Sequence, residues 1–205
     1  MITKPRKAKI LDLHPMQFSL GLVEVDNKVK KMGKMSSKEL EKYMKGHVVP
    51  VVVGPDKKLY LIDHHHFIRA CWEFNLDEVY IQVIARMSHH PVDKFWNSMK
   101  HTGWCYLKDQ FGKSHHQSEL PKTIRGMGDD AYRSLAWVVR EKGGFKKSTV
   151  PFTEFYWADL FRRRMQWGPN EYDPLSKKGI REALTICKNS EAKKLPGYKR
   201  ETSSS

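Results

Sequence analysis

A short apolar segment that runs directly into a cluster of polar residues is the feature that most constrains this sequence. Leu59 to Ile62 are typical of a strand and Phe67 to Glu73 of a helix, and the run Asp63-His64-His65-His66 lies between them. The first N–H groups of a helix have no partner within the helix, and the helix dipole is positive there, so this position favours an anion. The order strand, polar loop, helix therefore predicts a binding site at the start of the helix.

The three histidines exceed what a helix start requires, since an aspartate alone can cap a helix. An imidazole can donate or accept a hydrogen bond, transfer a proton near neutral pH, or ligate a metal. Consecutive helical side chains point in different directions, so His64, His65 and His66 do not converge on one ion by themselves. We therefore expect contacts to phosphate rather than a permanent metal site, with a polar cap of incidental histidines as the alternative.

The surrounding pattern predicts an α+β fold. Residues 48–53 and 79–84 are rich in β-branched side chains, and residues 54–58 contain the Gly, Pro and Asp of a turn. Ser36 and Glu39 have the spacing of a capping box at the start of a helix. Apolar residues recur every three or four positions in four later segments, which we expect to be helices: 92–101, 131–142, 153–167 and 176–188. Asp129 and Asp130 precede the second of these, where acids favour a helix start.

The pattern changes from strands to helices after about residue 88, and this change predicts three regions. Residues 1–88 form the part that contains the sheet, residues 89–192 form a helical region, and residues 193–205 form a disordered tail of Pro, Gly and Ser.

The composition favours an anionic partner. The chain of 205 residues has a net charge of +14 and can bury a normal core. Its three cysteines are odd in number and lack the spacing of a zinc or redox pair, which indicates free thiols in a reducing compartment. We find no secretory leader and no membrane span, so we expect a cytoplasmic protein without a membrane partner.

The run Asp63-His64-His65-His66-Phe67-Ile68-Arg69-Ala70, in this order of elements, resembles the ParB/sulfiredoxin superfamily, and in particular its "ParB-like nuclease" branch with an Asp-His-His-His signature. Further segments between residues 8 and 165 are similar to that branch: His14-Pro15-Met16-Gln17, Gly21-Leu22-Val23-Glu24-Val25, Asp129 to Ala136, Gly143-Gly144-Phe145 and Phe155 to Asp159. The resemblance implies a mixed sheet with helices, followed by a mainly helical C-terminal half. Sulfiredoxin's catalytic cysteine corresponds to His65 here, so we do not expect a sulfinic acid reductase.

The resemblance also implies a site and its ligands. Asp63, His64, His65, His66 and Arg69 correspond to the loop that holds nucleotide phosphates in the superfamily. Glu24 lies in the segment similar to the family's first motif, as does a glutamate that acts on the substrate hydroxyl in the free serine kinases. The implied ligand is Mg²⁺ with ATP, ADP or CTP, or a small phosphorylated substrate.

Three functions remain open. The first is an enzyme that transfers or hydrolyses a phosphoryl group, with Glu24, His65 and His66 as catalytic residues. The second is a DNA-associated ParB-like protein, and the third is a nuclease, for which nucleic acid would be the partner. The sequence leaves the substrate, any metal ligands and the oligomeric state open.

Overall fold

The structure is a computed structural model that describes residues 3–165 and 173–199. The chain forms two compact units, Met1–Asp129 and Asp130–Ser205. The sequence pattern placed a boundary near residue 88, whereas residues 89–129 belong to the first unit.

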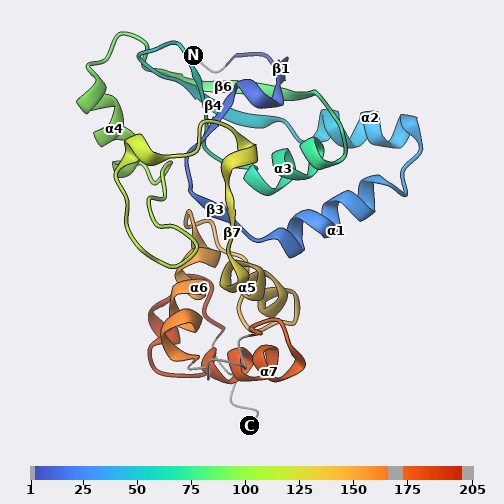
Figure 1. Cartoon of the computed structure of the whole chain (residues 1–205), viewed down its shortest axis with the longest axis vertical. Helices are drawn as coiled ribbons and strands as arrows, with labels where there is room; N and C mark the ends of the chain where they lie inside the picture. The colour runs from blue at the N-terminus through green and yellow to red at the C-terminus, as the bar shows by residue number, and fades with distance from the viewer. Residues whose placement is uncertain (1–2, 166–172, 200–205) are drawn as a thin grey trace. The chain divides into compact units, whose positions relative to one another are not determined.

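The first unit is built on a curled five-stranded mixed sheet in the order β1-β6-β4-β5-β2 (Figure 1). The central pair β4 and β6 is parallel, as is the edge pair β5 and β2, while β1 with β6 and β4 with β5 are antiparallel. The strand bounds are Arg6–Lys9 for β1, Leu13–Pro15 for β2, Val49–Val53 for β4, Leu59–Leu61 for β5 and Glu78–Arg86 for β6. The predicted strands are thus present, and the α+β class is confirmed.

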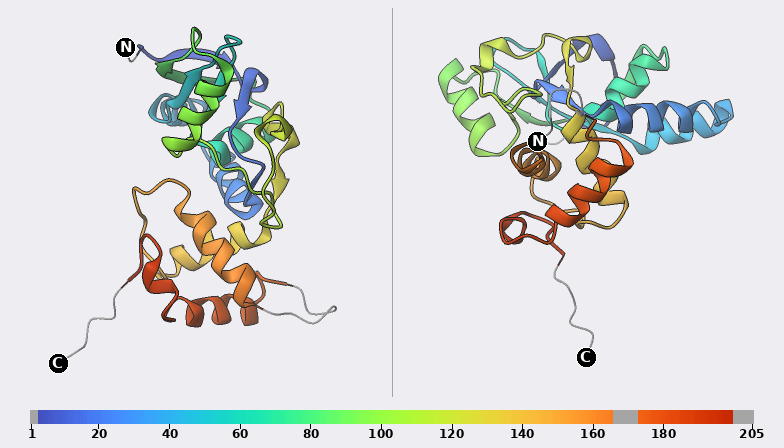
Figure 2. Two further views of the ribbon diagram at one scale, coloured as in Figure 1. Left: turned by 90° about the vertical axis from the view of Figure 1, so that its left-hand side faces the viewer. Right: turned by 60° about the horizontal axis from the view of Figure 1, so that its bottom comes forward.

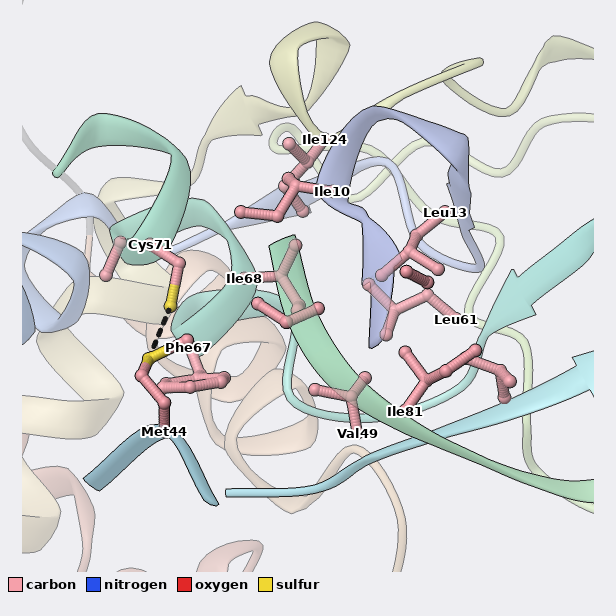
Figure 3. Packing of buried hydrophobic residues seen from close by; sticks show 14 of the residues in the cluster. Ile10, Leu13, Met44, Val49, Leu61, Phe67, Ile68, Cys71, Ile81 and Ile124 are labelled. Carbon is pink, nitrogen blue, oxygen red and sulfur yellow. Dashed lines mark hydrogen bonds between the residues drawn. The ribbon is translucent and has the colours of Figure 1, made fainter. Parts of the chain in front are cut away.

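Helices cover one face of this sheet with a continuous apolar core. The helices are α1 (Leu22–Met32), α2 (Ser37–Gly46) and α3 (His65–Glu73), and α1 and α2 form a hairpin that extends from the sheet in the right-hand view of Figure 2. Phe67, Ile68 and Cys71 of α3 pack with Val49 and Ile81 of the strands (Figure 3). The capping box of Ser36 and Glu39 begins α2 as predicted.

A fourth helix covers the opposite face. Phe95 and Met99 of α4 (Val92–His101) pack against Val52 of β4. The residues on either side of Val52, Val51 and Val53, belong to the core on the other face, because side chains alternate along a strand.

A second, two-stranded parallel sheet fixes the start of α1. It pairs β3 (Ser19–Leu20) with β7 (Gly128–Asp129), and Leu20 lies opposite Asp129. The pairing brings the segment before α1 beside residues more than a hundred positions away in the chain.

The second unit is a helical cluster of α5 (Ala131–Glu141), α6 (Thr153–Arg164) and α7 (Lys177–Ile186). Trp157 is buried and stacks on Phe145. The predicted helix over 153–167 extends into residues 166 and 167, which lie outside the described residues.

The expected disorder of the tail is wrong for residues 193–199. Residues 192–194 form a short 3-10 turn, the indole N–H of Trp157 donates to the Pro196 carbonyl at 2.9 Å, and the Lys146 N–H donates to the Gly197 carbonyl at 2.7 Å. The first bond satisfies the indole N–H of a buried side chain. Residues 200–205 lie outside the described part of the chain.

Candidate functional site

The loop between β5 and α3 turns the chain through a left-handed residue. His64 has φ 67° and ψ 22° and is the first residue of the turn into α3. A residue other than glycine adopts this region at a cost of about 1 kcal/mol, and such strain is frequent at functional sites. Asp63, expected as the helix cap, is exposed and accepts the His64 N–H at 2.6 Å. Within the described residues no side chain caps the start of α3, so that end of the helix favours an anion.

His65 is buried and holds this loop in place through hydrogen bonds. Its side chain is 3% exposed, its Nε2 accepts the Met16 N–H at 3.1 Å, and its ring also hydrogen-bonds the Leu61 backbone. Burial, and to a smaller extent the neighbouring His66 and His64, lower the pKa of His65 to about 3. The ring is therefore neutral, and it bonds the residue after β2 as well as the last residue of β5. This placement does not suit the acid–base and phosphate roles that we predicted for His65.

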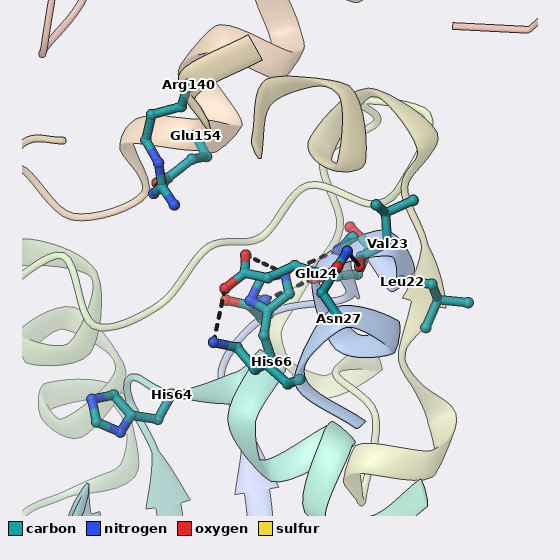
Figure 4. A network of polar contacts seen from close by, with 12 residues as sticks. Leu22, Val23, Glu24, Asn27, His64, His66, Arg140 and Glu154 are labelled. Atoms are coloured by element: carbon teal, nitrogen blue, oxygen red, sulfur yellow. Dashed lines mark hydrogen bonds and ion pairs between the residues drawn. The ribbon is translucent and has the colours of Figure 1, made fainter. Parts of the chain in front are cut away.

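His66 and Glu24 lie close together, although they are 42 positions apart in the chain. The His66 Nε2 lies 3.0 Å from the Gly21 N and 3.8 Å from the Glu24 Oε2. Glu24 occupies the first turn of α1, and its Oε1 lies 3.4 Å from the Lys28 Nζ. Figure 4 shows the His66 ring beside the Glu24 carboxylate, with His64 apart from this pair. Two of the three predicted catalytic residues are thus brought together.

Asp129 is the residue of this site whose role the sequence did not indicate. Its Oδ1 accepts the Leu22 N–H at 3.0 Å and so caps α1. Asp130 does start α5, since its Oδ1 accepts the N–H groups of Tyr132 and Arg133. No local pattern could reveal the role of Asp129, because it acts on a residue 107 positions away.

The Arg69 guanidinium bonds groups outside the predicted phosphate loop. Its Nε donates to the Glu73 Oε1 at 2.6 Å, one turn further along α3. Its Nη1 donates to the carbonyls of Ile124 and Met127 at 3.3 and 3.4 Å. The guanidinium thereby attaches the segment before β7 to α3, and a phosphate role for Arg69 does not fit this placement.

A separate polar cluster of Asp109, His115 and Glu119 lies on the loop after α4. The His115 ring nitrogens lie 2.8 Å from Asp109 Oδ2 and 3.1 Å from Glu119 Oε2. The hydrogen bonds to Asp109 and then Glu119 raise the pKa of His115. The His115 ring also lies against Phe18, with ring centroids 5.0 Å apart, so this cluster supports the segment between β2 and β3.

The arrangement at the start of α3 provides a carboxylate and an imidazole where α1 and α3 begin. The two helices pack against each other, and both helix starts favour negative charge. Across residues 3–165 and 173–199, no group of three or more His, Cys, Asp or Glu is arranged to hold a metal ion. In the same residues no helix has the length and apolarity that crossing a membrane requires.

The curled mixed sheet and the loop that starts α3 lie within residues 6–163, over which the chain matches a family of ParB-like proteins. Residues 6–163 match the model of the family described as "Putative ParB-like nuclease", and the chain belongs to that family. The resemblance seen in the sequence is thus confirmed at the level of the family.

A solved structure has the same fold. The crystal structure of protein Atu1540 from Agrobacterium tumefaciens is 35% identical, with a TM-score of 0.84, over 96% of this chain and 98% of that chain. No curated protein matches the chain significantly.

Proposed function

We propose that this protein binds the phosphates of a nucleotide, or of another phosphoryl ligand, at the Asp63–Arg69 segment, and transfers or hydrolyses a phosphoryl group. The observation that carries the proposal is the meeting of Glu24 and His66 at the starts of two helices. Acid–base groups beside an anion-binding helix start are what phosphoryl chemistry requires.

The backbone supplies most of the binding in this proposal. The start of α3 offers N–H groups to phosphate oxygens, and the His66 ring lies beside them. Asp63 and His64 shape the loop, since the Asp63 carboxylate holds the His64 N–H and His64 provides the left-handed turn. His65 holds the loop on the sheet. The net charge of +14 attracts an anionic ligand at longer range.

In the proposed chemical step, Glu24 accepts the proton of the attacking group. The oxygen of a water molecule or an acceptor hydroxyl forms a bond to phosphorus while the bond from phosphorus to the leaving oxygen breaks. The Glu24 carboxylate takes the proton of the attacking oxygen, and His66 stabilises the charge on the phosphoryl oxygens. Such general base catalysis is worth about 10²- to 10⁴-fold in rate.

Mg²⁺ with ATP, ADP or CTP is the ligand that the family resemblance suggests. The described side chains form no cage for the ion, so Mg²⁺ would come coordinated by the nucleotide phosphates and water, as is usual for this ion. Its contribution would be to neutralise phosphate charge.

A nuclease is the second candidate, and the family description favours it. The same site would then act on a phosphodiester, and the positive charge of the chain would hold the nucleic acid. A DNA-associated binding protein would use that charge without a chemical step.

Thermal unfolding with ligands separates these functions, because a ligand that binds only the native state raises the midpoint. The panel is ATP, ADP, CTP, GTP, pyrophosphate and short DNA, each with and without Mg²⁺. A nucleotide shift supports the phosphoryl site, whereas a shift with DNA alone that disappears in salt supports nucleic-acid binding.

Turnover of the ligand that binds then tests Glu24. We expect Glu24→Gln to lower phosphate release or DNA cleavage at least about 100-fold. Glu41→Gln is the matched control, since Glu41 also pairs with a lysine one turn away but is exposed on α2. Full activity of Glu24→Gln would disprove the assignment.

A further inference from the structure

The His66 Nε2 faces two groups that require opposite protonation states. The Gly21 N–H, at 3.0 Å, is a donor and needs the lone pair of a neutral ring. The Glu24 Oε2, at 3.8 Å, is an acceptor and is paired best when Nε2 carries a proton. One nitrogen cannot serve both groups at the same time.

We propose that protonation of His66 exchanges its partner from the Gly21 N–H to the Glu24 carboxylate and makes the Gly21 N–H available to a phosphoryl oxygen. The exchange itself needs only the residues of this chain, whereas the ligand step rests on the function proposed above. A proton enters from solvent onto Nε2, and no other covalent bond forms or breaks.

The geometry favours the exchange because both partners are already adjacent. A protonated Nε2 would set its N–H against the Gly21 N–H, which is repulsive, while the carboxylate lies just beyond hydrogen-bond distance. The side chains of His66 and Glu24 are 12% and 14% exposed. An ion pair at this depth is screened less than one on the surface.

The groups around His66 determine which backbone N–H the exchange makes available. Lys28 contacts the other oxygen of Glu24, and His65 on α3 is neutral. Asp129 accepts the Leu22 N–H, so this second N–H at the start of α1 stays occupied. Gly21 therefore carries the N–H that the protonation of His66 uncovers.

The exchange couples ligand binding to proton uptake. The affinity for a phosphoryl anion then rises as the pH falls through the His66 titration. By linkage, the bound anion raises the pH at which His66 titrates.

The unliganded protein tests the exchange by ¹⁵N NMR. The His66 ring nitrogens and the Gly21 amide are followed over pH, and we expect both to change with one midpoint. In Glu24→Gln the shared midpoint moves to lower pH, because the partner of the protonated ring has lost its charge. In His66→Gln the Gly21 amide no longer titrates, although the glutamine oxygen can still accept its N–H. A Gly21 amide that stays constant while His66 titrates would overturn the proposal.

Pyrophosphate, added at several pH values, tests the ligand step. Its own charge changes with pH, so His66→Gln is the matched control. We expect the affinity of the natural protein to gain up to about tenfold more per pH unit than that of His66→Gln, the limit for one linked proton. Equal pH dependence in both proteins overturns the ligand step but leaves the phosphate site in place. Absence of binding in both, with the joint titration intact, instead overturns the proposed function.

Discussion

Truncation of His65 separates a positioning role from a catalytic one. His65→Ala removes a buried ring that accepts the Met16 N–H and bonds the Leu61 backbone. Each backbone group left buried without a partner costs about 1–3 kcal/mol, and the space left by the ring adds the cost of a cavity. We expect the first unit to lose roughly 3–5 kcal/mol of its free energy of unfolding.

The measurement has to report on the first unit alone, since a chain of two units need not unfold in one step. Native-state hydrogen exchange at the buried amides of Val51 and Val83, in β4 and β6, gives that quantity. His65→Gln is the intermediate variant, because its side-chain oxygen can still accept the Met16 N–H, and we expect about half the loss. His90→Ala, at an exposed histidine, is the control and should change stability by less than about 0.5 kcal/mol.

The pH dependence of this free energy of unfolding is a second test, because the sign of the His65 contribution is known. The pKa of His65 is lowered to about 3 from 6.5, so its stabilisation is present above pH 6.5 and is lost as the pH falls toward 3. Within that window each pH unit removes up to about 1.4 kcal/mol, and His65→Ala should abolish this contribution. If His65→Ala kept its stability within about 0.5 kcal/mol and yet lost activity, the positioning role would be refuted.

Three further predictions concern neighbouring groups. The pKa of His115 is raised in the folded protein, so protonated His115 stabilises the loop after α4 below pH 6.5, and this stabilisation is lost as the pH rises through the pKa of the folded state. Asp109→Asn should lower the midpoint of the His115 titration measured by NMR. An unchanged midpoint would contradict the pairing of His115 with Asp109. His64→Gly should relieve the left-handed strain and raise stability by up to about 1 kcal/mol in urea unfolding, whereas a loss would show that the ring contributes more than the strain costs. Arg69→Ala should lower stability by about 1.5–3 kcal/mol through the lost bond to Glu73, with Arg125→Ala, at an exposed arginine, as its control.

The order of the elements could be read from the sequence because local interactions set it. The segments rich in β-branched residues, the turn at residues 54–58 and the capping box at Ser36 each depend on interactions within a few positions. The structure has strands and helices at these places, with ends that differ by a few residues. Tyr106 and Lys108, by contrast, form isolated bridges with Gln17 and Ser114, and no local pattern indicates these partners.

The sequence by itself determined that histidines would stand at the start of a helix beyond a buried strand. Only the tertiary structure decided what each one does, because successive residues of a helix start point in different directions. That rotation turns His65 into the sheet and leaves His66 beside Gly21 and Glu24, partners more than forty positions away. Such contacts depend on how the chain packs, and no pattern within a short window contains them.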